Sequence, residues 1–124
     1  MEQQKVILNT DKYKLSQAIY NILTNAYKFT EPNGRVLLSY KVTSEELILT
    51  IEDNGPGISK EVQEKIFDAY YKRDTTINTA GEGIGLYVAK ENLTSINGSI
   101  FVDSELNRGS RFIISIPRQF VIKK

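Results

Sequence analysis

The sequence predicts an α+β domain in which an antiparallel or mixed sheet carries helices on one face. Two segments show the apolar spacing of helices, and several short apolar segments bounded by turn residues have the character of strands. Few of the expected strand pairs are linked by a helix, which disfavours a parallel arrangement. Because 124 residues suit one compact core, we expect a single domain over 1–124.

The first half of the chain is expected to form a strand, a long helix and a hairpin. Asp11 is a residue type that caps helices, and helical spacing continues from it to about Phe29. Turn residues at 31–34 then stop the helix. The apolar positions of this helix are Leu15, Ala18, Ile19, Ile22, Leu23 and Ala26. Strands are expected at 5–8, 35–43 and 47–53.

The second half combines loops with a further helix and more strands. A loop rich in glycine and proline covers 54–59, one or two helical turns follow over 60–67, and 68–82 has no sustained periodicity. A loop of that length inside a small domain is often a binding lid. The remaining expected elements are a helix from Gly83 to about Ile96 ended by Asn97-Gly98, strands at 99–103 and 111–116 before Pro117, and a small edge strand at 120–122.

Composition excludes several classes of protein. The net charge is +1, from 16 basic and 15 acidic side chains, so the chain lacks the excess of positive charge that favours binding to nucleic acid or an anionic membrane. The chain has no cysteine and no histidine, which excludes thiol catalysis, Ser-His-Asp hydrolysis and histidine-ligated metals. Its apolar runs are too short to span a bilayer, and its first residues lack a signal-peptide pattern.

Polar residues of the first helix form the first candidate site. Asn21, Asn25 and Lys28 recur at i, i+4 and i+7, so they share one stripe beside the apolar one. Such a stripe is usually a solvated face. Asparagine is a poor helix former, however, and its neutral amide oxygen is a ligand suited to Mg²⁺. The lysine one turn on can meet a phosphate as a point charge.

The loop after the strand at 47–53 forms the second candidate site, with the sequence Asp53-Asn54-Gly55-Pro56-Gly57-Ile58. Strand parity puts Asp53 on the apolar face of its strand, where a carboxylate needs a hydrogen-bond donor. The exocyclic amine of adenine is one such donor. A cap on the Gly-Pro-Gly turn explains the aspartate equally well. The glycines let the backbone approach a flat ring.

Two further segments carry weaker signals. The sequence Gly81-Glu82-Gly83-Ile84-Gly85-Leu86 precedes a helix, and free amides at a helix start hold anions. It matches neither a P-loop nor a dinucleotide fingerprint, and a flexible hinge is the plainer interpretation. Aromatic and basic residues alternate over 66–73. They form either a core cluster followed by solvated charge, or a lid that packs through Phe67 and offers Lys72 to a phosphate.

Taken in order, these motifs resemble the catalytic domain of sensor histidine kinases. The stretch Asn21-x-x-x-Asn25-Ala26-x-Lys28-Phe29 resembles their N box, and Asp53-x-Gly55-x-Gly57-Ile58 resembles their first glycine box. Residues 66–72 are similar to the F box, 81–86 to the second glycine box, and Gly109-Ser110-x-Phe112 to the third. The resemblance implies the Bergerat ATP-binding fold, a two-layer α/β sandwich whose mixed, mostly antiparallel sheet is covered on one face by about three helices.

The resemblance also implies a role for each matching residue. Asn25 would ligate Mg²⁺ with help from Asn21, and Asp53 would accept from the adenine amine. Lys28 and Lys72 would contact phosphate and would complete the catalytic set with the two asparagines. The residues that would bind ATP are Asn25, Lys28, Phe29, Asp53, Gly55, Gly57, Ile58, Phe67, Gly81, Gly83, Ile84, Gly85, Leu86 and Ser110. Of these, Phe29 would lie against adenine and Gly57 would let the base approach.

The implied activity is that of a protein histidine kinase in two-component signal transduction, which binds Mg-ATP and transfers its γ-phosphoryl group to a histidine. Related ATPases and serine kinases of this fold carry Glu where this chain has Asn21, and an amide cannot be the general base that water or serine needs. Because the chain has no histidine, the acceptor would lie on a separate dimerisation domain, with a response regulator as the next partner. We expect a cytoplasmic, monomeric domain without nucleic-acid or membrane contact, from a parent kinase that is often membrane-anchored.

Two other activities stay open at this point. Lys72 stands where the family has arginine, Glu82 where it has a small residue, and Ala69-Tyr70 where Pro-Phe is common. Lysine lacks the fork geometry with which arginine holds a phosphate. These departures favour a nucleotide-dependent interaction module with weak catalysis. A self-contained ATPase of the same fold is the third interpretation.

Overall fold

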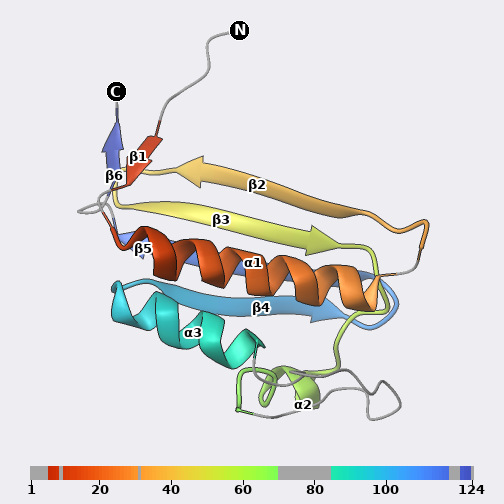
Figure 1. Ribbon diagram of the computed structural model, residues 1–124. Helices are drawn as coiled ribbons and strands as arrows, with labels where there is room; N and C mark the ends of the chain where they lie inside the picture. The colour runs from red at the N-terminus through yellow and green to blue at the C-terminus, as the bar shows by residue number, and fades with distance from the viewer. Residues whose placement is uncertain (1–5, 9, 31, 70–84, 118–120, 124) are drawn as a thin grey trace, which may run out of the picture.

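The protein forms two layers, a four-stranded antiparallel sheet and a layer of helices on one of its faces (Figure 1). The computed structural model describes residues 6–8, 10–30, 32–69, 85–117 and 121–123. The sheet has the strand order β2-β3-β5-β4. Its elements are β2 (Val36–Val42), β3 (Glu46–Asp53), β4 (Ser99–Glu105) and β5 (Gly109–Pro117). The helices are α1 (Lys12–Phe29), α2 (Lys60–Gln63) and α3 (Gly85–Ser95).

Helix α1 begins and ends where the sequence predicts. The Asp11 side chain accepts a hydrogen bond from the Lys14 amide at 3.1 Å, which satisfies one of the free amides of the first turn. At the other end, Thr30 has an extended backbone and its hydroxyl donates to the Ala26 carbonyl. The buried positions Leu15, Ala18, Ile22 and Ala26 lie on one stripe of the helix, so α1 buries that face and leaves the opposite one in solvent.

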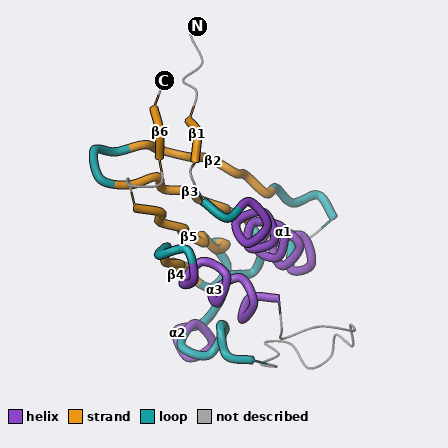
Figure 2. The backbone as a smooth tube through the Cα atoms, turned by 60° about the vertical axis from the view of Figure 1, so that its left-hand side comes forward, coloured by secondary structure: helices purple, strands orange, loops and turns teal. Residues whose placement is uncertain are grey.

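Strands β3 and β5 form the centre of the sheet, and their inward faces make the floor of the core. Ile51 is paired with Phe112 and Leu47 with Ile116, and all four side chains are buried. Helices α1 and α3 pack over this floor through Ile22 and Leu93 among others (Figure 2). The alternation that turns every second side chain inward continues to the last pair of the two strands, Asp53 and Ser110. These two are the buried polar residues in the described part of the chain. The sheet therefore delivers a carboxylate and a hydroxyl to one end of the core.

Three residues with left-handed backbone shape the β4–β5 hairpin and the end of α3. Asn107 (φ 68°) and Gly109 (φ 100°) turn the chain from β4 into β5. Asn97 (φ 64°) follows α3, and the Gly98 amide donates back to the Leu93 carbonyl at 2.7 Å. The predicted stop at Asn97-Gly98 is therefore correct, but asparagine rather than glycine takes the left-handed position.

Most element boundaries agree with the sequence analysis to within a few residues. The expected edge strand near 120–122 is β6 (Val121–Lys123), and it pairs antiparallel with β1 (Val6–Leu8) in a separate two-stranded sheet. The segment at 60–67 contains only the single-turn helix α2. Of the expected lid over 68–82, residues 70–82 lie outside the described residues, as does any start of α3 before Gly85. Within the described residues, no helix combines the length and apolar character needed to cross a bilayer.

Truncation of the central aromatic side chain should cost much of the stability of the domain. Phe112 is fully buried, so Phe112→Ala is expected to lower the free energy of unfolding by about 3–5 kcal/mol, measured by urea denaturation. Phe101→Ala is the matched control, because that phenylalanine is 51% exposed on the other face of the neighbouring strand. Equal losses for the two variants would contradict the assigned core.

The cap of α1 gives a second stability test. Asp11→Ala is expected to lower the free energy of unfolding by about 1 kcal/mol, because a free amide in the first turn loses its acceptor. Asp11→Asn should retain most of the stability, since an asparagine side chain caps equally well. A loss of the same size in both variants would show that charge rather than capping matters at this position.

Candidate functional site

The candidate site lies where the C-terminal half of α1 meets the start of α3 and the loop after β3. Asn21 makes the first of these connections, because its side-chain nitrogen donates to the Gly85 carbonyl at 3.1 Å. This contact fixes the orientation of the amide. The Asn21 oxygen makes no hydrogen bond within the described part of the chain, so it is the atom available to a ligand. The contact also holds α1 beside the first residue of α3.

Asn25 lies one turn further along the same face of α1. Its side-chain nitrogen is buried and has no hydrogen-bond partner among the described residues. A buried amide left without a partner costs about 1–3 kcal/mol, and rotating the amide by half a turn would place its oxygen there instead. The unpaired Asn25 amide is therefore a candidate for binding a ligand.

The chemistry of these donors fits Mg²⁺ held together with a nucleotide. No group of three or more His, Cys, Asp or Glu side chains that could hold a metal occurs in the ranges that the structure describes. Magnesium commonly takes only one or two protein oxygens and obtains its other ligands from phosphates and water. The amide oxygens of Asn25 and Asn21 meet that requirement, whereas an all-protein metal cage does not form here.

Lys28 and Phe29 end α1 beside the same region. The Lys28 ammonium nitrogen lies 5.6 Å from the centroid of the Phe29 ring, within the range of a cation–π contact. Both side chains are partly exposed. A positive charge and an aromatic face are thus presented together at the C-terminal end of the helix.

Asp53 caps the turn that follows β3, one of the two roles that the sequence leaves open for it. Its side chain is only 7% exposed, and its Oδ1 accepts from the Gly55 amide at 2.9 Å. The carboxylate therefore does cap the turn. Its second oxygen, Oδ2, makes no hydrogen bond to any described residue. One oxygen shapes the loop, and the other stays available to accept from a ligand.

Close backbone packing explains both glycines of this loop. A Cβ on Gly55 would lie 2.8 Å from the Phe29 carbonyl oxygen, so the loop touches the end of α1. A Cβ on Gly57 (φ +80°) would lie 2.0 Å from the Glu105 carbonyl oxygen. The structure thus shows a requirement for Gly57 that the sequence analysis missed, since the residue packs against the β4–β5 hairpin.

Three predicted ligand-binding residues have side chains that take part in the core. Ile58 and Leu86 are 3% and 8% exposed. The Phe67 ring lies edge-on to the Phe112 ring, with centroids 6.2 Å apart, and the Lys90 ammonium nitrogen lies 5.6 Å from the centroid of the Phe67 ring. Phe67 packs against the core, as both interpretations of residues 66–73 expect, and Lys72, which would separate them, lies outside the described residues. Because the side chains of Ile58 and Leu86 are buried, these two residues would contact a ligand mainly through their backbone atoms.

Ser110 is buried opposite Asp53 in the register of β3 and β5. Its hydroxyl lies 2.9 Å from the hydroxyl of Ser104 on β4. The remaining predicted site residues lie outside the described residues: they are Lys72, Gly81, Gly83 and Ile84.

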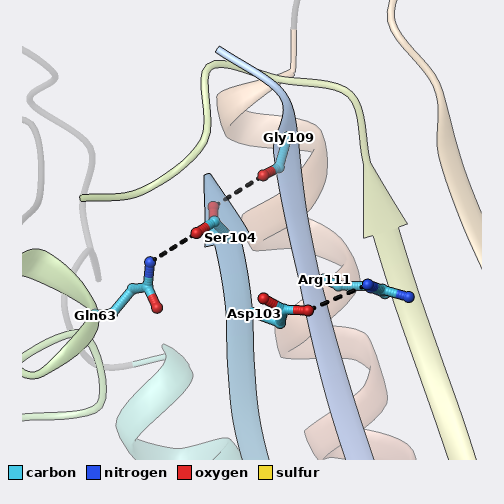
Figure 3. Close-up of polar contacts among 5 residues, drawn as sticks. All are labelled: Gln63, Asp103, Ser104, Gly109 and Arg111. Carbon is cyan, nitrogen blue, oxygen red and sulfur yellow. Dashed lines mark hydrogen bonds and ion pairs between the residues drawn. The ribbon is translucent and has the colours of Figure 1, made fainter. Parts of the chain in front are cut away.

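The sequence analysis missed a polar connection behind the loop, and Figure 3 shows three of its residues, Gln63, Ser104 and Gly109. The Ser104 hydroxyl accepts from the Ile58 amide at 2.8 Å. The Gln63 side chain donates to the carbonyls of Ile58 and Ser104 at 2.7 and 3.1 Å. The sequence does contain a sign of this role. Ser104 shares the inward face of its strand with Ile100 and Val102, so it stands where an apolar residue is expected. The connection holds the loop after β3 against the β4–β5 hairpin.

A hollow of about 190 Å³ lies at the same end of the sheet, but α1 does not line it. Its walls include charged side chains of the sheet face opposite the helices, among them Arg111 and Asp103, which form an ion pair at 3.1 Å (Figure 3). Asn21, Asn25 and Phe29 are not among its lining residues. The hollow therefore shares Asp53 and Ser110 with the candidate site, but no residue of α1 or α3 lines it.

Comparison with known proteins identifies the family of this chain. Residues 10–119 match the family model described as histidine kinase-, DNA gyrase B-, and HSP90-like ATPase. Sensor protein SrrB of Staphylococcus aureus (strain NCTC 8325 / PS 47) is 34% identical over 117 residues, which cover 93% of this chain and 20% of SrrB. This chain therefore spans about one fifth of the length of that relative.

Solved structures give the same result. The mycobacterial sensor histidine kinase MprB superimposes with a TM-score of 0.79 at 27% identity, over 89% of this chain and 76% of that one. Full-length ShkA in complex with AMPPNP superimposes with a TM-score of 0.71 at 30% identity, over 84% of this chain and 21% of that one. The predicted two-layer Bergerat fold is confirmed. The chain belongs to the family of histidine kinase-, DNA gyrase B-, and HSP90-like ATPases, and it is homologous to sensor histidine kinases.

Proposed function

We propose that this domain binds Mg-ATP and transfers the γ-phosphoryl group to a histidine on a separate dimerisation domain, which then serves a response regulator. The observation that carries the proposal is the position of Asn25. Its unpartnered buried amide lies on α1 between the Asn21–Gly85 contact and the Phe29–Gly55 contact. An amide for the metal and a carboxylate for the base thus flank one region.

Adenine would bind at the Asp53 end of this region. The Oδ2 atom of Asp53 would accept from the exocyclic amine, because Oδ1 is already used by the Gly55 amide. Phe29 would lie against the ring, and the loop at Gly57-Ile58 would border it. The AMPPNP complex of the homologous ShkA supports an adenine nucleotide as the ligand of this fold.

The phosphates and Mg²⁺ would bind toward Asn25 and Asn21. When bound, Mg²⁺ neutralises charge on the phosphate oxygens. Asn25 would supply an amide oxygen to it, and the Asn21 oxygen would assist through the metal or its water. Lys28 would contact phosphate. The further residues proposed for the triphosphate are Lys72, Gly81, Gly83, Ile84, Gly85 and Leu86.

The transfer would be an in-line displacement. A neutral imidazole nitrogen attacks the γ-phosphorus, the bond to the bridging oxygen breaks, and ADP leaves with that electron pair. Asn21 cannot remove a proton, and the imidazole does not need it to, because its free lone pair is already nucleophilic. An amide at this position therefore suits transfer to histidine better than hydrolysis.

A nucleotide-dependent interaction module with weak catalysis is the second candidate. Lys72 and Glu82 favour it, because a point charge replaces the fork of an arginine and a carboxylate would stand near a triphosphate. A self-contained ATPase is a weaker candidate, because the amide of Asn21 cannot act as the general base that hydrolysis needs. Transfer to an added histidine domain separates these possibilities.

Loss of the Asp53 carboxylate should weaken ATP binding. We expect Asp53→Ala to raise the Kd for ATP roughly 10- to 100-fold in calorimetric titration, because a charged acceptor for the adenine amine is lost. Asp103→Ala is the control, since that carboxylate lies on the face of the sheet opposite the helices. An unchanged Kd in a folded Asp53→Ala variant would exclude this site for adenine.

Asn25 should couple ATP binding to Mg²⁺. The wild type is expected to bind ATP more tightly with Mg²⁺ than with EDTA, and Asn25→Ala should lose most of that difference. Asn92→Ala is a matched control, because the Asn92 side-chain nitrogen is also buried and unpartnered but lies near the other end of α3 from Gly85. If Asn92→Ala lost the Mg²⁺ effect and Asn25→Ala kept it, the metal site would be misplaced.

Phosphotransfer should require an added acceptor. Labelled ATP is expected to label a histidine-bearing dimerisation domain of a sensor kinase only when this chain is present, and the label should be acid-labile and base-stable. The isolated chain should incorporate none, because it contains no histidine. ATP binding without any transfer would favour the interaction module. Phosphate release without a partner would favour the ATPase.

A further inference from the structure

Helix α1 carries a second row of apolar side chains besides the one that packs into the core. Tyr13, Tyr20 and Tyr27 recur every seven residues and are 87%, 66% and 69% exposed. Because an α-helix drifts only about 20° per seven residues, the three rings lie on one line, each about 10 Å from the next. Ser16 and Leu23 fall between them, at the spacing of a coiled-coil seam. We name these five residues the tyrosine seam.

Strand β2 adds apolar surface beside this helix. Leu38 is paired with the buried Ile51, so it lies on the inward face of the sheet, yet it is 48% exposed. Tyr40, two residues on, lies on the same face and is 54% exposed. Helices α1 and α3 lie over the other strands and leave β2 uncovered (Figure 1). Leu38 and Tyr40 therefore form an apolar step beside α1, which we name the β2 ledge.

The seam borders this ledge and points away from the candidate nucleotide site. Helix α1 lies between α3 and β2, next to both. Asn21 donates to Gly85 of α3, and Leu23, two residues on, lies about 200° around the helix, on the β2 side. Tyr20 lies about 140° around the helix from Asn25 by the same count. An acceptor histidine that approaches the asparagines therefore does not occupy the seam, which is a separate surface.

The charge of this surface has one sign. Helix α1 contains Lys12, Lys14 and Lys28 and no carboxylate, and β2 contains Lys41 and no carboxylate. The chain as a whole is nearly balanced, with 16 basic and 15 acidic side chains. Asp11, just before the helix, accepts a hydrogen bond from the Lys14 amide. The surface therefore presents aromatic rings in positive surroundings, which suits a partner that brings apolar and acidic groups together.

Two other occupants fit this surface less well. A second copy of the chain, docked seam to seam, would bring two lysine-bearing helices together with no carboxylate on either. An anionic membrane is flat, so it would meet the tyrosine rings but not the β2 ledge, which lies in the sheet layer beneath the helix layer (Figure 1). A helix, in contrast, fills an apolar step between a helix and a strand.

We infer that the tyrosine seam and the β2 ledge form a docking surface for an amphipathic helix of a partner, which carries apolar residues at heptad spacing and carboxylates along their edges. Its apolar side chains pack between the tyrosine rings and against Leu38, and its carboxylates pair with lysines such as Lys12. Tyrosine suits such a surface, because its ring gives a large contact area with few rotatable bonds while its hydroxyl stays hydrated. The inference goes beyond the proposed function and does not depend on nucleotide binding.

The test is fluorescence anisotropy with a labelled three-heptad peptide that has leucine at heptad positions a and d and glutamate at e and g. A peptide with lysine in place of each glutamate is the charge control. The full chain should bind the acidic peptide at least roughly tenfold more tightly than the basic one, because like charges placed together oppose docking. Lys12→Glu should narrow that difference.

Tyr20 lies at the centre of the seam and gives the most informative variant. Tyr20→Ala should raise the Kd for the acidic peptide roughly tenfold, as removal of a central aromatic contact commonly does. Tyr20→Phe keeps the ring and should keep most of the affinity. Phe101→Ala is the matched control, because that ring is 51% exposed on the opposite face of the sheet, and it should leave the Kd unchanged. Urea denaturation should show all three variants folded, since each changes an exposed ring.

The inference is overturned if neither peptide binds, if both bind equally, or if a folded Tyr20→Ala keeps the wild-type Kd. A dimer in sedimentation that Tyr20→Ala abolishes would assign the seam to a second copy. Binding to phosphatidylserine vesicles that Tyr20→Ala abolishes would assign it to a membrane, and competition by an added histidine-bearing dimerisation domain would assign it to phosphotransfer. Each of these results overturns the inference. A chain that does not bind ATP overturns the proposed function only.

Discussion

The pairing of β3 with β5 is the constraint on which the remainder of the molecule depends. Its inward side chains, such as Ile51 and Phe112, form the floor on which both long helices pack. The same alternation, continued by one more pair, brings Asp53 and Ser110 to the edge of the core. The same strand register therefore builds both the floor of the hydrophobic core and the polar site. A slip of one residue between the two strands would turn one of these polar groups to the opposite face of the sheet.

Helices α1 and α3 position the polar side chains of the site without pairing all of them. Helix α1 buries a stripe of small and branched side chains, and its asparagines lie beside that stripe. Asn21 is held by Gly85 at the start of α3, whereas Asn25 has no protein partner among the described residues. Burial of an unsatisfied amide is unfavourable for stability alone. That cost is understandable if Asn25 is kept for a ligand. The two asparagines differ in this respect, because only Asn21 has a protein partner among the described residues.

The loop after β3 is positioned from behind rather than by its own sequence alone. Gly57 contacts the backbone of Glu105 so closely that no side chain fits, and Gly109 approaches the Asp53 carbonyl in the same manner. Ser104 and Gln63 then bond the loop to the hairpin. These contacts make the β4–β5 hairpin a rigid support for the proposed base-binding edge. Preorganisation of this kind reduces the entropy lost when a ligand binds.

The sequence by itself determined the elements and the identity of most site residues, because periodicity, caps and turn residues act over a few neighbouring positions. It placed Asp53 at the end of an inward face and the asparagines on one stripe of a helix. It did not reveal the roles of Ser104, Gly109 or Gln63. Those roles rest on contacts between distant residues, 46 positions apart for Ile58 and Ser104 and 41 for Gln63 and Ser104. Only tertiary structure decides such contacts, since they exist only once the sheet register and the helix packing have brought distant segments together.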